Sequence, residues 1–367
     1  MQARRPRLPR VRTVRRGLAA LLLWTAPVLA GSLFSGGFEV LPPPERGGST
    51  FNWYRLGPGC DREPWGILAN YHEAGVRAWV RQQLMELRAS GQDRISLGLF
   101  HQRAEPPSAD GRVTGTVLDS SAGRLHPQME HNLIDLLADI RAAAFAELVF
   151  RYHPQGRNDV RNEDGWDDSL RDENWSLIAS VEPLLQRSGV PWVTDLFAEG
   201  MPRARTIGSI ILDNVPQFED WSDYARFVWR AYTDAFGTAN TLGFSFVSDT
   251  DARRIDARAR HMDYIYGSRR PAQLGFSLYG GSRGEDWIFR EYRRQLEDEG
   301  WGDLPWIITE TWYDDPLAAG RIRKAMEANR KQVRFLIQWP VERHSTCSEH
   351  VSVAPPRGFS AYLGRGF

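Results

Sequence analysis

The pattern that decides the fold is clearest in residues 306–339, WIITETWYDDPLAAGRIRKAMEANRKQVRFLIQW. This stretch opens with a short apolar run, Trp306–Trp312, and closes with another, Val333–Trp339. Between them, Pro316–Arg330 has apolar residues spaced three and four apart, as on one face of an amphipathic helix. A strand, a helix and a second strand in this order predict one β-α unit of a parallel sheet.

The same alternation of short apolar runs and helical patterns continues along most of the chain. The apolar runs predict these strands: Thr50–Arg55, Ile95–His101, Glu147–His153, Trp192–Glu199, Thr241–Val247, Gln273–Tyr279, Trp306–Trp312 and Val333–Trp339. The patterns between them predict these helices: Pro64–Arg88, Gln128–Ala144, Asn174–Arg187, Trp221–Phe236, Ala252–Ile265, Asp286–Glu299 and Pro316–Arg330. This count predicts a (β/α)8 TIM barrel of one domain, with the eighth helix displaced or lost.

Length and composition agree with this fold without deciding it alone. The 367 residues fit one barrel with long loops, although they would also fit two domains. With 42% hydrophobic and 25% charged residues, the composition is globular, which excludes a disordered or fibrous protein. An open doubly wound sheet is the alternative fold, but Gly57-Pro58-Gly59 after the first strand matches neither a dinucleotide-binding nor a phosphate-binding turn.

The N-terminal residues have the pattern of a signal peptide. A stretch with seven arginines precedes the apolar run Leu18–Ala30, which is shorter than the roughly 20 residues of a membrane-spanning helix. We therefore expect a signal peptide over 1–30, a flexible lead-in over 31–48, and the barrel over 49–367; an uncleaved anchor is the alternative. The mature chain would be periplasmic or secreted, with no membrane attachment beyond the signal peptide. Removal of the signal leaves 46 − 7 = 39 basic residues against 46 acidic ones, which argues against a nucleic-acid partner.

The chain contains two cysteines, Cys60 and Cys347. In an exported protein, two cysteines are expected to form a disulfide rather than a metal site. Cys60 follows the first predicted strand and Cys347 follows the last, and closure of a barrel makes those strands neighbours. We therefore predict a Cys60–Cys347 disulfide.

Candidate catalytic residues stand at the ends of the predicted strands, because a barrel presents its active site at the C-terminal ends of its strands. Glu199 ends the fourth strand and Glu310 ends the seventh, and both follow apolar sequence. The following residues also lie in or near strand ends and are candidates for substrate binding: Trp53, His101, Arg151, His153, Asp195, Tyr279, Trp312 and Trp339. A purely structural alternative is that either glutamate pairs with Arg151 or Arg55 at the end of the barrel.

Four of these segments together resemble the retaining glycoside hydrolases of the large barrel clan, clan A, including its cellulase-like members. The similar segments are Tyr152–Gly156, Val193–Glu199, Ile307–Trp312 and Leu336–Trp339. The resemblance implies a (β/α)8 barrel in which Glu199 is the acid/base, Glu310 is the nucleophile and Trp339 lies beneath the sugar before the cleaved bond. One residue departs from the pattern: the family usually has Asn directly before the acid/base, where it binds the sugar 2-hydroxyl, and this chain has Ala198. Either another group binds that hydroxyl, or the substrate is unusual, or activity has been lost.

The two glutamates suit retaining hydrolysis chemically. That reaction needs one ionised carboxylate and one protonated carboxyl about 5–5.5 Å apart. We expect Tyr279, Arg151 or His153 to donate hydrogen bonds to Glu310, and we expect more apolar surroundings for Glu199. Tryptophan side chains at strand ends could stack on the apolar faces of sugars, although core packing explains any one of them equally well.

No metal or cofactor is expected. A metal-dependent barrel hydrolase would have a His-x-His pair on its first strand, where this chain has Phe51-Asn52-Trp53. The acidic stretch 162–168 invites a calcium interpretation, but Val160 and Arg171 stand at the first and last ligand positions of an EF-hand-like loop. A solvated acidic loop is the better interpretation.

The sequence thus predicts an exported retaining glycoside hydrolase that acts on a polysaccharide or other carbohydrate substrate. The alternative from another class is a non-catalytic glycan-binding barrel that serves polysaccharide export or assembly, which Ala198 favours and the two glutamates disfavour. A transglycosylase with the same residues is a third possibility, because it differs only in the acceptor of the intermediate.

Overall fold

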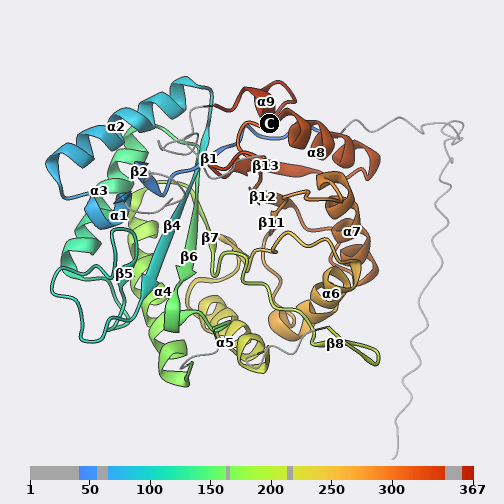
Figure 1. Ribbon diagram of the computed structural model, residues 1–367, viewed down its shortest axis with the longest axis horizontal. Helices are drawn as coiled ribbons and strands as arrows, with labels where there is room; N and C mark the ends of the chain where they lie inside the picture. Colours follow the sequence, from blue (N-terminus) through green and yellow to red (C-terminus); the bar gives the residue numbers. More distant parts are fainter. Residues whose placement is uncertain (1–40, 56–64, 163–165, 213–217, 344–357) are drawn as a thin grey trace, which may run out of the picture. The chain divides into compact units, whose positions relative to one another are not determined.

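The computed structural model describes residues 41–55, 65–162, 166–212, 218–343 and 358–367, with a parallel barrel at its centre (Figure 1). The barrel strands are β1 (Gly48–Thr50), β4 (Arg94–Gln102), β6 (Glu147–Pro154), β7 (Trp192–Asp195), β10 (Thr241–Gly243), β11 (Leu274–Ser277), β12 (Trp306–Glu310) and β13 (Val333–Gln338). They pair in the order β10-β7-β6-β4-β1-β13-β12-β11, and each of these pairs is parallel. A parallel bridge between Phe246, beyond β10, and Phe276 in β11 brings the two ends of this order together, so the barrel is nearly closed.

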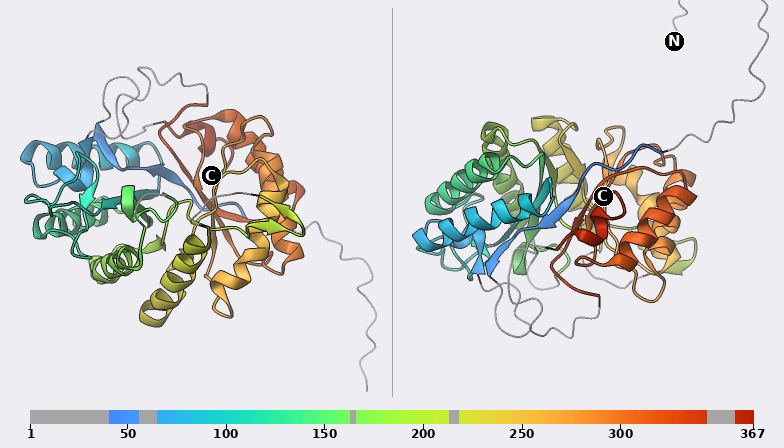
Figure 2. Two further views of the ribbon diagram at one scale, coloured as in Figure 1. Left: turned by 60° about the horizontal axis from the view of Figure 1, so that its bottom comes forward. Right: turned by 90° about the horizontal axis from the view of Figure 1, so that it is seen from above.

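Helices surround these strands. The long helices in the described residues are α2 (Ala74–Ala89), α3 (Pro127–Ala142), α4 (Asp168–Ser188), α5 (Phe218–Phe236), α6 (Ala252–Tyr266), α7 (Glu285–Asp298) and α8 (Pro316–Ala328). The short elements are α1 (Ile67–Asn70), α9 (Ser360–Leu363), the 3-10 helix Gly156–Asn158, and strands β2 (Trp53–Arg55), β3 (Trp65–Gly66), β5 (Leu118–Asp119), β8 (Thr206–Ile207) and β9 (Ile210–Ile211). Figure 2 shows α2, α3 and α4 on one side of the strands and α6, α7 and α8 on the other.

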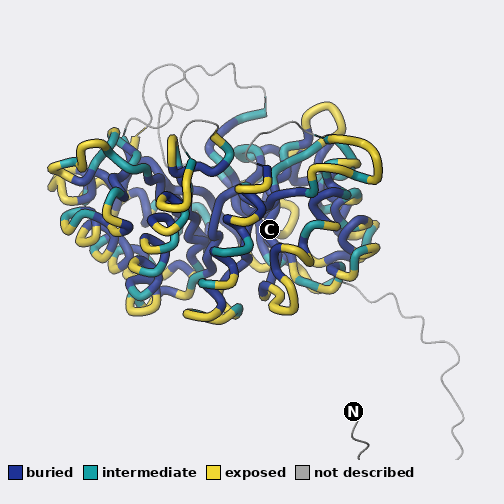
Figure 3. The backbone as a smooth tube through the Cα atoms, turned by 90° about the horizontal axis from the view of Figure 1, so that it is seen from below, coloured by how far each residue is buried: buried dark blue, intermediate teal, exposed yellow. Residues whose placement is uncertain are grey.

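The hydrophobic core has two layers. The larger layer lies between the strands and the helices, and a smaller cluster contains strand residues only, so we place it inside the barrel. The inner cluster consists of Val149, Val193, Leu242, Ile307, Phe335 and Ile337. Figure 3 shows the result: the strands are buried, and the exposed residues lie on the outer helices and loops.

The first strand begins at Gly48, two residues earlier than predicted, and this position requires a glycine. A Cβ atom on Gly48 would lie 1.7 Å from the Arg94 carbonyl oxygen, so only glycine allows β1 to approach β4 this closely. The prediction of a flexible lead-in up to residue 48 is therefore wrong for Gly48. The predicted strand Thr50–Arg55 is also divided, because residues 53–55 form β2, which pairs antiparallel with β3.

The fourth and fifth strands end earlier than predicted. Strand β10 stops at Gly243, where φ is +69°, a conformation that glycine adopts far more readily than other residues. The chain beyond it still bonds to β11, since Phe246 N–H donates to the Gly275 carbonyl oxygen at 2.8 Å. Strand β7 stops at Asp195, so Glu199 lies in the loop that follows it.

Two of the predicted helices differ most from the structure. Helix α4 begins six residues before Asn174 because the Asp167 carboxylate caps it, accepting hydrogen bonds from the Ser169 and Leu170 N–H groups at 2.7 and 3.2 Å. The predicted helix over residues 64–88 is two helices, α1 and α2.

The predicted single-domain (β/α)8 barrel is confirmed, and residues 41–367 form one compact unit. The predicted signal peptide over 1–30 and the predicted disulfide between Cys60 and Cys347 lie outside the described residues. No helix in the described part of the chain has the length and apolar character needed to cross a membrane.

Candidate active site

The candidate site lies at the C-terminal ends of the barrel strands. Arg151 is in β6, Asp195 ends β7 and Glu310 ends β12. Because all eight strands are parallel, these ends meet at one mouth of the barrel. The pairing between β11 and β12 shifts at this point, so that Glu310 rather than Thr309 lies opposite Ser277. The fold therefore brings Arg151, Asp195 and Glu310, which lie far apart in the sequence, to the same end of the barrel.

Glu310 is held by hydrogen bonds to both of its carboxylate oxygens. Arg151 Nη1 donates to Oε1, and Tyr279 Oη donates to Oε2 at 3.0 Å. The residue is 8% exposed, so it is nearly but not completely buried. Two of the three donors expected for Glu310, Arg151 and Tyr279, thus contact it. With one donor bonded to each oxygen, the carboxylate group of Glu310 is held in one orientation.

Arg151 also bonds to a second acid. Its Nε donates to Asp195 Oδ2 at 3.0 Å, and Asp195 Oδ1 accepts a hydrogen bond from the Ser245 N–H at 3.0 Å. Burial alone would lower the pKa of Arg151, but the charges of Glu310 and Asp195 raise it above its ordinary value. Arg151 therefore stays charged, and its pairing offsets the cost of burying it.

Glu199 has a different environment from Glu310. Burial raises the pKa of Glu199 to about 7, and the negative charge of Glu310 adds to this increase, while the Ser277 hydroxyl and the charges of Arg151 and Arg161 oppose it. Its backbone has φ +54°, in the left-handed region, and its N–H donates to Ser245 Oγ at 2.7 Å. Glu199 is therefore the carboxyl that keeps its proton near neutral pH.

Two of the predicted tryptophans are partly exposed at this mouth, Trp339 and Trp312. Trp53 packs edge to face against Trp339, with ring centroids 5.3 Å apart, and Tyr279 packs in the same way against Trp312 at 4.9 Å. The indole N–H of Trp312 donates to Glu285 Oε1 at 3.1 Å. Each exposed ring is thus fixed by a neighbour.

Glu285, at the first residue of α7, is a member of this site that the sequence did not reveal. Its side chain has no exposed surface and accepts hydrogen bonds from four donors on separate segments. The donors are Gly280 N at 3.1 Å, Trp312 Nε1 at 3.1 Å, Arg321 Nη1 at 3.2 Å and Arg343 Nη2 at 2.5 Å. Acidic residues are common at helix N-termini, so the sequence alone does not distinguish Glu285 from an acid that only stabilises α7.

His153 lies two residues after Arg151 in β6 and is a neutral ring. It stacks on Phe100 with centroids 4.3 Å apart, and a Cβ on Gly98 would lie 2.9 Å from the ring, so Gly98 makes room for it. Burial and the charge of Arg151 lower the pKa of His153 well below its ordinary value. Its Nε2 atom is buried with no hydrogen-bond partner in the described residues. A substrate hydroxyl could supply that partner.

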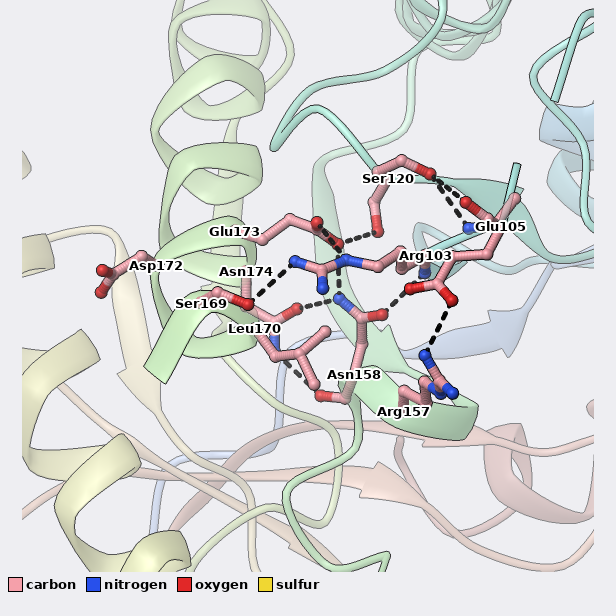
Figure 4. Close-up of polar contacts among 12 residues, drawn as sticks. Arg103, Glu105, Ser120, Arg157, Asn158, Ser169, Leu170, Asp172, Glu173 and Asn174 are labelled. Atoms are coloured by element: carbon pink, nitrogen blue, oxygen red, sulfur yellow. Dashed lines mark hydrogen bonds and ion pairs between the residues drawn. The ribbon is translucent and has the colours of Figure 1, made fainter. Parts of the chain in front are cut away.

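His101 belongs to a separate polar network, which Figure 4 shows in part. Its Nδ1 lies 3.1 Å from Ser120 Oγ, and Ser120 Oγ donates to Glu173 Oε1 at 3.4 Å. Glu173 also accepts hydrogen bonds from Arg103 Nε and Asn158 Nδ2, both at 2.9 Å. These bonds tie the loops after β4 and β6 to helix α4. The network therefore fixes these two loops at the C-terminal ends of β4 and β6.

Four residues predicted to bind substrate lie beneath the surface instead: Trp53, His101, Arg151 and Asp195, with exposed fractions of 0 to 2%. Their side chains contact other residues of the protein, so we assign them to the support of the site.

The ion pair between Arg151 and Glu310 that the sequence suggested as a structural alternative is present. Arg55 instead lies over the Trp65 ring, 3.8 Å from its centroid. The described residues contain no group of three or more His, Cys, Asp or Glu placed to hold a metal ion.

Comparisons with known proteins identify the fold. No protein-family model matches the chain, and no curated protein matches it. Among solved structures, it is similar to GH5_18 from Bifidobacterium longum subsp. longum, with a TM-score of 0.51 and 9% identity over 81% of this chain and 70% of that one.

Two further solved structures match less well. A GH5-4 broad-specificity endoglucanase from Clostridium longisporum has a TM-score of 0.49 and 9% identity, with coverage of 87% and 94%. A glucosidase from Croceicoccus marinus has a TM-score of 0.46 and 12% identity, and the match covers 86% of this chain but only 65% of that one. At such low identity, the similarity to the Bifidobacterium protein establishes the barrel fold alone.

Proposed function

We propose that this protein is an exported retaining glycoside hydrolase, with Glu310 as the nucleophile and Glu199 as the acid/base, acting on a polysaccharide or other glycan. The observation that carries the proposal is the contrast between two carboxyl groups that interact at one barrel mouth. Glu310 accepts hydrogen bonds on both oxygens, whereas Glu199 is partly buried and has a pKa raised to about 7. Retaining hydrolysis requires this division between an ionised and a protonated carboxyl.

In the first step, the Glu310 carboxylate attacks the anomeric carbon while the bond from that carbon to the leaving oxygen breaks. The proton of Glu199 moves to the leaving oxygen, so the departing sugar leaves as an alcohol. In the second step, a water molecule gives its proton to Glu199 and attacks the anomeric carbon, which releases Glu310. Two inversions at the same carbon retain the anomeric configuration.

The partly exposed rings of Trp339 and Trp312 give the site apolar surfaces of the kind that the C–H faces of sugars stack on. His153 has a buried nitrogen with no hydrogen-bond partner among the residues that the structure describes, which suits a contact with a sugar hydroxyl. Together these groups favour a carbohydrate over a charged or purely apolar substrate.

One residue favours a second candidate function, a non-catalytic glycan-binding barrel. Ala198 stands directly before Glu199, and its methyl group cannot form the hydrogen bond to the sugar 2-hydroxyl that the resembling family makes with Asn. Such a protein would bind glycans without turning them over. A transglycosylase would use the same two glutamates and replace water by a sugar acceptor.

A mechanism-based label tests the proposal. The purified protein is incubated with 2-fluoro glycosides of gluco, manno and galacto configuration that carry an activated leaving group, and the labelled peptide is identified by mass spectrometry. We expect the label on Glu310 and none on Glu310→Ala. Glu199→Ala should still form the intermediate from activated substrates and should yield a glycosyl azide when azide is added. Glycan binding without labelling or turnover on any of these sugars would instead establish the non-catalytic function.

Export is tested separately. The intact mass of the protein recovered from the periplasm or medium should correspond to cleavage after Ala30. A retained arginine-rich N-terminus would indicate an anchor.

A further inference from the structure

We infer that Ser245 positions Glu199 for proton transfer and couples it to the charged network around Glu310. The inference rests on the proposed function and adds a positioning residue that the sequence did not single out. Ser245 lies two residues beyond β10, on the fifth strand position of the barrel, and has no exposed surface. It can therefore affect a substrate only through the residues that it holds.

Ser245 contacts three of the groups that build the site. Its Oγ accepts a hydrogen bond from the Glu199 N–H at 2.7 Å and another from Arg151 Nη2 at 3.3 Å. Its own N–H donates to Asp195 Oδ1 at 3.0 Å. Since Arg151 also donates to Glu310, Ser245 is the residue through which the backbone of one glutamate is joined to the side chain of the other.

The contact with Glu199 determines where its carboxyl points. Residues on either side bond to backbone oxygens: Ala198 N–H donates to Tyr152 O and Gly200 N–H donates to Phe197 O, each at 2.9 Å. The N–H of Glu199 donates instead to the Ser245 side chain, while the backbone of Glu199 has φ +54°. A residue with a Cβ atom keeps this conformation only when its surroundings over-determine it, and Ser245 supplies one of the bonds that do so.

Ala198, directly before Glu199, cannot support the Glu199 backbone through its side chain. Ala198 has no polar side chain, so it offers the loop no hydrogen bond beyond its backbone groups. The polar side-chain support for the Glu199 backbone therefore comes from the adjacent strand position. A serine hydroxyl can accept two hydrogen bonds, which matches the two donors, Glu199 N–H and Arg151 Nη2.

The test is how strongly the rate depends on the leaving group. Wild type and Ser245→Ala are compared by kcat/KM on aryl glycosides that range from 2,4-dinitrophenyl to phenyl. Ser245→Ala removes both acceptor lone pairs, so a displaced Glu199 should transfer its proton poorly. We expect a loss of about 10- to 100-fold on the phenyl glycoside and of less than about 3-fold on the dinitrophenyl glycoside, which needs no proton.

Two further variants separate this effect from a loss of packing. Ser245→Cys keeps nearly the same volume but has a weak acceptor, so it should behave like Ser245→Ala. Ser96→Ala is the matched control, because Ser96 is another fully buried serine of a barrel strand and its Oγ has no hydrogen-bond partner in the described residues. Ser96→Ala should keep the wild-type dependence on the leaving group.

Amide hydrogen exchange tests the loss of the hydrogen bond from the Glu199 N–H directly. Amide hydrogen exchange of the peptide that contains Glu199 should be about tenfold faster in Ser245→Ala than in wild type, because its N–H loses its acceptor. An equal loss on every leaving group, unchanged kinetics, or unchanged exchange at Glu199 would overturn the inference while the proposed function stands. Absence of turnover and of labelling in wild type would overturn both.

Discussion

Tyr279 and Glu310 follow or end neighbouring strands of the barrel, and Tyr279 Oη donates a hydrogen bond of 3.0 Å to Glu310 Oε2. Burial raises the pKa of Tyr279 well above its ordinary value, and the negative charges of Glu310 and Glu199 add to the increase. The phenol therefore keeps its proton and remains a donor at any pH at which the protein works. The other oxygen of Glu310 accepts from Arg151, so the carboxylate cannot rotate without losing a charge-assisted bond.

Tyr279→Phe tests this pair. The variant keeps the ring that packs against Trp312 and removes only the hydroxyl. A hydrogen bond to a charged group contributes about 1.5–3 kcal/mol, so we expect kcat to fall about 10- to 100-fold with little change in KM. Steady-state kinetics measure the loss, and circular dichroism checks the fold. A kcat equal to that of wild type would show that Arg151 alone orients Glu310.

The charge of Glu310 should control the titration of Glu199. Because the pKa of Glu199 is about 7, kcat/KM should fall as pH rises through 7 and Glu199 loses its proton. Glu310→Gln removes a negative charge that raises this pKa, so the pKa of Glu199 should decrease. Carbon-13 NMR of glutamate-labelled protein measures it directly.

Glu147→Gln is the matched control for that titration. Glu147 is the first residue of β6, so the variant removes the same charge at the opposite end of the barrel from Glu199. The pKa of Glu199 should stay near 7 in Glu147→Gln. The proposed coupling would be contradicted if both variants gave the wild-type value.

Glu285 should influence substrate binding through Trp312. Glu285→Gln keeps the shape of the side chain but removes the charge that faces Arg321 and Arg343, so the hydrogen bond to the Trp312 indole should weaken. We expect KM for a glycan substrate to rise about tenfold with a smaller change in kcat, as measured by steady-state kinetics.

Two variants accompany Glu285→Gln. Trp312→Phe removes the indole N–H and leaves the other donors to Glu285 in place, so it should also raise KM without a large loss of stability. Asp286→Asn is the control, because Asp286 is the next residue of α7 and lies 3.9 Å from Arg321 without touching Trp312 in the described contacts. A KM effect in Asp286→Asn as large as in Glu285→Gln would indicate a general effect of charge.

The barrel could be predicted because each of its units carries a local pattern. Residues 306–308 are apolar and begin β12, and residues 316–328 have helical spacing and form α8, so neither assignment depends on the rest of the chain. The positions of Glu199 and Glu310 at one mouth then follow from the parallel order of the strands. Local pattern and topology together were sufficient for the two carboxyl groups.

Ser245 and Glu285 could not be predicted, because their roles depend on contacts between distant segments. Ser245 lies between two phenylalanines in a run that indicates only a strand, and its partner Glu199 is placed by the turn after β7. The burial of Asp195 and His101 was missed for the same reason, since strand ends are covered by loops whose course the sequence pattern does not reveal. Gly48 looked like flexible chain, although the close approach of β4 requires it.

A buried acid outside the site should make the stability of the protein depend on pH. Glu182 in α4 has no exposed surface, and its carboxyl accepts hydrogen bonds from Thr194 Oγ1 at 2.8 Å and Tyr232 Oη at 3.2 Å. Burial raises the pKa of Glu182 from 4.5 to about 7 in the folded protein. The folded state therefore holds this proton at pH values at which the unfolded state has already released it.

The sign of the effect follows from this difference in proton binding. The stability associated with protonated Glu182 is fully present below pH 4.5 and is lost as pH rises through 7, which amounts to about 3 kcal/mol at pH 8. Glu182→Gln resembles the protonated carboxyl at every pH, so its free energy of unfolding relative to wild type should increase by about that amount between pH 4.5 and 8. Urea unfolding at both pH values measures the change, with Glu130→Gln on the exposed face of α3 as the control. If Glu182→Gln and Glu130→Gln shift the unfolding free energy by the same amount at both pH values, Glu182 is ionised in the folded protein, and a cation or water must compensate its charge.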